Sequence, residues 1–134
     1  MLQRDYIMRL LRQFIEALEK LVEEKKNEDM PTLQLKLQSL YRAYFNRLHT
    51  FYYEQEADFI LNDLGQNYKG EELLTRIDML SELIYQDALL KPEAEQRYLL
   101  GKSLYLLEYL DTHSDTFSFE RRNKICEIKT KTEG

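Results

Sequence analysis

Hydrophobic residues recur along the first part of the chain with the spacing of one helical stripe. Successive members lie four and three residues apart in alternation, which is the repeat of an amphipathic α-helix. The stripe consists of Ile7, Leu11, Phe14, Leu18 and Leu21, widened by Leu10, Ile15 and Val22. The pattern is lost in the all-polar segment 24–29, so we predict a first helix that ends there.

A second stripe follows Pro31, a residue that suits the first turn of a helix because its missing N–H has no partner there. The stripe contains Leu33, Leu37, Leu40, Tyr44 and Leu48, with Tyr41 and Phe45 beside it. We expect this helix to bend or stop within 49–54, because the three aromatic residues at 51–53 have low helix propensity. A short separate helix is predicted over about 55–64, closed by Gly65 just past its end.

Two longer helices are predicted next, over about 71–88 and 93–112. The buried face of the first carries Leu73, Ile77, Leu80, Ile84 and Ala88. The linker around Pro92 is very short, so the two helices should pack as an antiparallel hairpin. A last helix begins near Ser118, and the polar C-terminal tail 129–134 is expected to fray.

The segment 93–112 carries apolar residues on almost every side, and its polar residues fall on no single face. A helix that is apolar nearly all round is generally buried by neighbours on several sides. We therefore predict that 93–112 is the central element of the fold. Gly101 lies inside it, where glycine costs about 1 kcal/mol relative to alanine. We expect the close approach of another helix to compensate for this cost.

Composition supports one all-α domain over residues 1–134. Hydrophobic residues make up 43% of the chain and charged residues 32%, which is too apolar for a disordered polar chain. The chain has 4 Gly and 2 Pro, which are too few for the many tight turns of an all-β fold. The predicted segments form a stack of antiparallel helical hairpins with about five to six helices.

Charge and cysteine content argue against several classes of protein. The net charge of −5 argues against a general nucleic-acid binder. No window approaches the roughly 18 uncharged apolar residues of a membrane span, so no membrane partner is expected. Cys126 is the single cysteine, and a lone thiol favours a reducing compartment. We therefore expect a cytoplasmic protein.

The helix–turn–helix segments resemble a tetratricopeptide unit. The second helix of such a unit carries a small residue, an aromatic residue four positions later and a small residue three positions after that. Ala94, Tyr98 and Gly101 fit this spacing. Glu82 and Leu106 occupy positions where the unit has a small residue and a proline, and no second copy of the repeat is visible.

A closer resemblance covers nearly the whole chain. It rests on two segments, Met1-Leu2-Gln3-Arg4-Asp5-Tyr6-Ile7 and Phe117-Ser118-Phe119-Glu120-Arg121. These segments are similar to a bacterial family of short all-helical, tetratricopeptide-like proteins of unknown function. The resemblance implies a tetratricopeptide-like stack of helices. It brings no activity and no catalytic residues that could be transferred to this chain.

The chain shows no recognisable catalytic centre, so we do not expect an enzyme. Its two histidines, His49 and His113, belong to no zinc-binding or di-metal spacing, and we expect no metal ion and no cofactor. His49 with Glu54, Glu56 and Asp58 could surround a cation. We prefer to read these acids as the solvated start of a helix, where carboxylates favour the positive end of the dipole.

Cys126 is a second candidate for chemistry. It lies beside Ile125 and Ile128, and a buried free cysteine usually acts as a small hydrophobe. Arg122 and Lys129 lie within one helical turn, which leaves a reactive thiolate open as the alternative.

Aromatic residues are the unusual feature of the composition, with 10 Tyr, 6 Phe and no Trp. Tyrosine combines an apolar ring with a polar tip, which suits interfaces. We select Tyr44, Phe51, Tyr52 and Tyr53 as candidate partner-binding residues. The alternative is the edge of a core, with hydroxyls reaching water. Helical spacing favours that alternative for Tyr44 but does not explain three consecutive aromatic residues at 51–53.

The sequence therefore favours a non-enzymatic helical module that presents a groove to a protein or peptide partner, or to a second copy of itself. The alternative is a small-molecule-binding regulatory domain, or a minor enzyme, with a pocket between helices in the same region. A shallow elongated groove favours the first function. A deep pocket with convergent polar groups favours the second.

Overall fold

The computed structural model describes residues 2–133, and this part of the chain is all-helical, as predicted. Its elements are α1 (Leu2–Glu24), α2 (Met30–Phe45), α3 (His49–Glu54), α4 (Ala57–Asn67), α5 (Gly70–Ala88), α6 (Glu93–His113) and α7 (Phe119–Glu133). Met1, part of the first segment behind the family resemblance, and Gly134, the end of the predicted tail, lie outside the described residues. The number of described helices is thus higher than the five to six that we expected, because residues 49–54 form a helix of their own, α3.

The second helix ends earlier than predicted. Asn46 adopts the left-handed conformation, with φ 63°, and its N–H donates to the carbonyl oxygen of Arg42 at 3.1 Å. Asparagine tolerates this conformation better than most residues, so it terminates α2 directly after Phe45. The segment that contains the aromatic residues 51–53, called the aromatic segment below, then forms α3 as a helix of its own, packed against α2.

The prediction that Gly65 closes the following helix was wrong. α4 continues through Gly65 and ends at Asn67, and Tyr68 after it returns to extended backbone. Among the described residues, the glycine with left-handed backbone is Gly70, with φ 58°, and it opens α5. A glycine marks a turn only where the chain requires that conformation, and position 65 does not.

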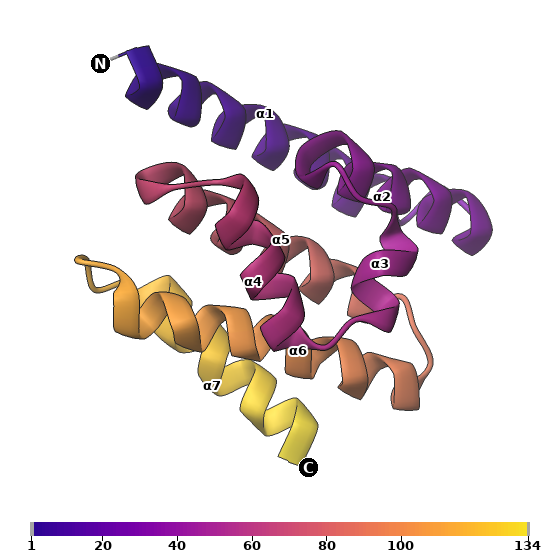
Figure 1. Ribbon diagram of the computed structural model, residues 1–134. Coiled ribbons are helices and arrows are strands. Elements are labelled where there is room, and N and C mark those ends of the chain that lie inside the picture. Colours follow the sequence, from indigo (N-terminus) through magenta and orange to yellow (C-terminus); the bar gives the residue numbers. More distant parts are fainter. Residues whose placement is uncertain (1, 134) are drawn as a thin grey trace.

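The central helix is α5, and the prediction that 93–112 is innermost was wrong. α5 packs mainly against α1, α2, α4 and α6, whereas α6 packs mainly against α4, α5 and α7 (Figure 1). Tyr98 and Tyr105 of α6 are exposed, at 46% and 43%. Tyrosine rings can remain at the surface because their hydroxyls reach water. Counting the tyrosines of α6 as apolar therefore overestimated how much of this helix is buried.

Gly101 does not mark a close approach between helices. A side chain added there would meet nothing within 4 Å, and the residue is exposed. Ala94 and Tyr98 are exposed as well, so none of the three residues with tetratricopeptide spacing is buried in a helix contact. The expectation that a neighbouring helix compensates for Gly101 was therefore wrong.

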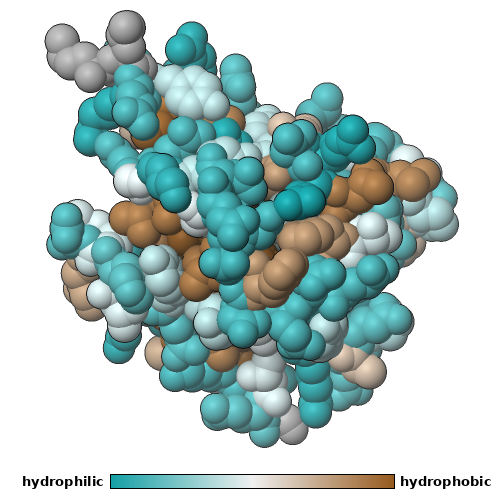
Figure 2. Space-filling model, in the orientation of Figure 1, coloured by the Kyte–Doolittle hydropathy of each residue, from teal (hydrophilic) through white to brown (hydrophobic). Residues whose placement is uncertain are grey.

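The helices form layers around α5. Figure 1 shows α1 with α2 on one side of α5, and α6 with α7 on the other side. α3 and α4 lie across the face of the molecule that is turned toward the viewer. On that face hydrophobic side chains gather in patches among hydrophilic ones (Figure 2). The short connection 89–92 joins α5 and α6 into the predicted antiparallel hairpin. α7 packs on α6 and remains helical to Glu133, so the expected fraying from residue 129 was wrong over 129–133.

Candidate functional site

Tyr52, one of the four residues selected for partner binding, lies in the core. Its ring is 0% exposed and stacks on the equally buried ring of Tyr41, with centroids 5.2 Å apart. A side chain without solvent exposure offers no surface to a partner, so the selection of Tyr52 was wrong. Tyr44, Phe51 and Tyr53 are half-buried and pack against this core. Consecutive aromatic residues are accommodated here because α3 packs several of its sides against the rest of the chain.

Asp87 of α5 anchors the aromatic segment through hydrogen bonds. Its Oδ2 accepts from the hydroxyl of Tyr41 at 2.7 Å and from that of Tyr53 at 2.6 Å. Its Oδ1 lies 3.4 Å from the Nζ of Lys91. Burial and the neighbouring Asp87 charge raise the pKa of Tyr41 well above its usual value, which keeps this hydroxyl a donor. One buried carboxylate thus joins α2 and α3 to α5.

Two buried cations donate to carbonyl oxygens at the ends of α2 and α3. Arg76 of α5 donates to the carbonyl oxygen of Tyr44, near the end of α2. Lys102 of α6 donates to the carbonyl oxygens of Tyr52 and Tyr53, at 2.7 and 3.0 Å, near the end of α3. The last carbonyls of a helix have no partner within the helix, and cations there also favour its dipole. These contacts hold the aromatic segment in place.

The buried position of Lys102 predicts a pH-dependent stability. Burial lowers the pKa of its ammonium from 10.5 to about 8, and the charge of Glu56 opposes this shift. Between these two values the unfolded chain binds the proton that the folded chain has released, so stability rises with pH. Above about pH 10 the trend reverses, because the buried tyrosines keep protons that the unfolded chain loses.

The expected gain in the free energy of unfolding between pH 8 and 10 is on the order of 2 kcal/mol. Urea denaturation at several pH values measures it. The Lys102→Met variant, which lacks the titrating group, should show no such rise. An equal rise in this variant would assign the effect to another residue.

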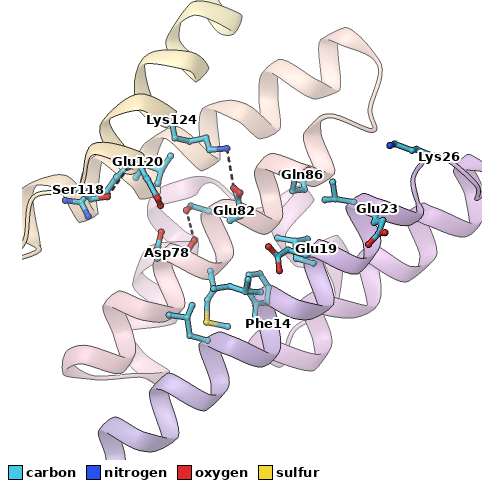
Figure 3. A pocket seen from close by; sticks show the side chains of 18 residues that line it. Phe14, Glu19, Glu23, Lys26, Asp78, Glu82, Gln86, Ser118, Glu120 and Lys124 are labelled. Carbon is cyan, nitrogen blue, oxygen red and sulfur yellow. Dashed lines mark hydrogen bonds and ion pairs between the residues drawn. The ribbon is translucent and has the colours of Figure 1, made fainter.

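A groove of about 780 Å³ lies between α1, α5 and α7 (Figure 3). None of the four residues selected for partner binding lines it. Its apolar lining comes mostly from α1, with one residue each from α5 and α6: Leu11, Phe14, Ile15, Leu18, Val22, Met79 and Leu107. Along α5 it reaches from Asp78 to Gln86, roughly 12 Å or two turns. Along α1 its lining runs from Leu11 to Glu23, roughly 18 Å or three turns, so the groove is elongated.

Acidic side chains predominate among the charged residues of the groove. They are Glu19, Glu23, Asp78, Glu82 and Glu120, against Lys26, Arg121 and Lys124. Figure 3 shows Lys124 reaching toward Glu82, and its Nζ lies 3.6 Å from Oε2. Desolvation by the surrounding side chains raises the pKa of Asp78 and of Glu82, although nearby cations oppose the shift. The groove therefore combines an apolar floor with a negatively charged border.

One signal in the sequence pointed to this groove. Ile15 and Val22 widen the apolar stripe of α1 beyond what its neighbours α2 and α5 cover. Both residues remain exposed, at 43% and 44%, where they border the groove. A stripe that is broader than its packing partner leaves apolar surface for another partner.

The remaining sequence candidates do not form a site. Among the described residues no group of three or more His, Cys, Asp or Glu side chains is arranged to hold a metal ion. Cys126 is exposed on α7, so the prediction of a buried thiol was wrong. Ile125 and Ile128 occupy the buried side of this helix instead. Over residues 2–133 no helix combines the length and the apolar character that crossing a bilayer requires.

Comparison of the chain with protein-family models, with curated proteins and with solved structures found no match. The geometry of the described residues therefore carries the functional argument.

Proposed function

We propose that this protein is a non-enzymatic, tetratricopeptide-like interaction module whose groove binds one amphipathic helix of a partner protein. The apolar rim of the groove on α1 carries the proposal, because Ile15 and Val22 remain 43% and 44% exposed where they border it. Helices that dock in grooves insert apolar residues at positions such as i, i+4 and i+7. Two turns of exposed groove match such a pattern.

Charge complementarity selects the occupant. Five acidic and three basic residues line the groove, and two of the cations already have carboxylate partners. Arg121 pairs with Asp111, and Lys124 pairs with Glu82. A partner helix flanked by lysine or arginine therefore fits this border better than an acidic one, because opposite charges favour association.

Ile15→Asp is expected to abolish this interaction by placing a charge on the apolar rim. The probe is a designed peptide of about four helical turns, with leucine along one face and lysine elsewhere, called the Lys peptide. Fluorescence anisotropy should show binding by the wild type and at least a roughly tenfold weaker affinity for the variant. The rim position is exposed, so circular dichroism should remain helical.

Leu35→Asp is the matched control, since Leu35 is exposed at 69% on α2 and does not line the groove. It should bind the Lys peptide as the wild type does. Equal affinities of all three proteins would contradict the groove as the docking site. Sedimentation velocity tests whether a second copy of the chain occupies the groove instead. If the wild type self-associates and Ile15→Asp removes this self-association, the groove binds a second copy and the proposed partner helix is overturned.

A small-molecule-binding domain, or a minor enzyme, is the second candidate. The volume of about 780 Å³ favours it, because ligand pockets commonly span roughly 300–1,000 Å³. The carboxyl groups of Asp78 and Glu82, with their raised pKa values, provide convergent polar groups. A thermal-shift screen of metabolites distinguishes the two functions, since a ligand that binds the folded form raises the melting temperature.

A further inference from the structure

Asp78 and Glu82 lie one helical turn apart on the side of α5 that faces the groove (Figure 3). Residues four apart on a helix are surface neighbours, so both carboxylates border the same part of the groove. The two carboxylates differ in their contacts, and this difference indicates which chemical group a ligand would place beside Asp78.

Glu82 already holds a cation. The Nζ of Lys124 lies 3.6 Å from its Oε2 and 3.8 Å from the centre of the Tyr85 ring. An alkylammonium group delivered by α7 therefore sits at the border of the groove, held by a carboxylate and an aromatic face. This contact shows which chemistry the groove accepts beside α5.

Asp78 has no equivalent contact. No described residue forms an ion pair or a side-chain hydrogen bond with its carboxylate; the one hydrogen bond at this residue goes to its backbone oxygen, from Ser81. Arg121 also lines the groove, but its guanidinium binds Asp111 at 3.3 Å and the backbone oxygen of Thr116 at 2.9 Å. Glu120 adds a further negative charge nearby. One position suited to a cation is thus left open.

Desolvation supports this interpretation. The surrounding groove raises the pKa of Asp78, with the positive charge of Arg121 opposing and Glu120 adding to the rise. The side chain itself remains exposed at the border of the groove, so the cation of a ligand can reach this carboxylate.

We propose that Asp78 is the specificity-determining residue of the groove and binds a lysine or arginine of the partner helix, as Glu82 binds Lys124. The inference rests on the proposed function, because it needs a helix in the groove. It adds a fixed position for one basic residue, at the end of the groove bordered by Ser118.

Charge reversal at Asp78 tests the inference. The probes are the Lys peptide and a Glu peptide that has the same leucine face with glutamate in place of lysine. Wild-type protein should bind the Lys peptide about tenfold more tightly than the Glu peptide, and Asp78→Lys should reverse the preference. Asp78→Asn, which keeps the side chain's shape, should reduce the preference without reversing it.

Glu54→Lys is the matched control, since it changes the net charge equally at an exposed position of α3 outside the groove. It should leave the preference for the Lys peptide nearly unchanged. If Asp78→Lys and Glu54→Lys shift the preference equally, general attraction explains it and the inference fails. If the protein binds both peptides and Ile15→Asp abolishes this binding, the groove is still supported as the docking site. The proposed function and the inference about Asp78 can therefore fail separately.

Discussion

Replacing Asp87 by alanine is expected to lower the free energy of unfolding by about 3–5 kcal/mol, which is the usual cost of removing one partner of a buried charged network. The carboxylate is 0% exposed and accepts hydrogen bonds from Tyr41 and Tyr53. Without it two hydroxyls lose their acceptor and the ammonium of Lys91 loses its counter-charge. Small domains have roughly 5–15 kcal/mol of stability, so the variant should be close to unfolding.

Urea denaturation followed by circular dichroism measures the loss, and a pair of tyrosines provides the control. Tyr41 and Tyr52 are both 0% exposed and stack on each other, but the Tyr52 hydroxyl has no hydrogen-bond partner among the described residues. Tyr41→Phe should therefore cost about 1.5–3 kcal/mol, and Tyr52→Phe should be nearly neutral or stabilising. Equal costs for the two would contradict the role given to Asp87.

Arg76→Met is expected to have the second largest effect, again about 3–5 kcal/mol. The guanidinium is buried, pairs with Glu72 at 3.0 Å, and also binds the backbone oxygen of Tyr44 and the hydroxyl of Tyr6. It further covers the ring of Tyr68 at 4.4 Å. Methionine fills the volume of the side chain but leaves the carboxylate and the end of α2 without a donor.

Arg97→Met provides a matched comparison, because Arg97 pairs with Glu93 at the same i,i+4 spacing on the surface of α6. Exposed pairs of this kind contribute about 0.3–0.5 kcal/mol, so this variant should unfold almost as the wild type does. Thermal and urea unfolding of the two variants measure the difference. Similar losses at both positions would show that burial does not set the value of the Arg76 contacts.

The two variants also separate stability from binding. Arg76, Asp87 and the aromatic segment do not line the groove. Partly destabilised protein that remains folded should therefore bind the Lys peptide with nearly the affinity of the wild type. The core network and the docking surface share α5 but use different faces of it.

Much of the helical organisation was predictable from the sequence. The stripe of α1, the two long helices and the hairpin that joins them follow from periodicity of three and four residues and from a short linker. Boundaries were less accurate, because a helix end such as Asn46 depends on one residue adopting a left-handed conformation. Gly65 shows the opposite case, a turn-forming residue that the surrounding helix simply includes.

The candidate site was less predictable. The aromatic residues at 51–53 suggested a surface, yet Tyr52 is buried because Tyr41 and Phe45 of α2 pack on it. The groove instead combines residues of α1, α5, α6 and α7 that lie far apart in the sequence. Only the broad apolar stripe of α1 hinted at it, and that stripe did not reveal which helix would be absent from its outer side.

Most of the helical segments follow from the sequence alone, since the apolar repeat and the scarcity of glycine and proline are local properties of the chain; α3, where a bend or stop was expected, is the exception. The central place of α5, the burial of charged residues and the position of uncovered apolar surface depend instead on how the helices pack. A buried aspartate or lysine is stable only beside its partners, and these are distant in the chain: Tyr41 lies 46 residues from Asp87, and Tyr52 lies 50 from Lys102. Periodicity measures how apolar a face is, but packing determines what covers it.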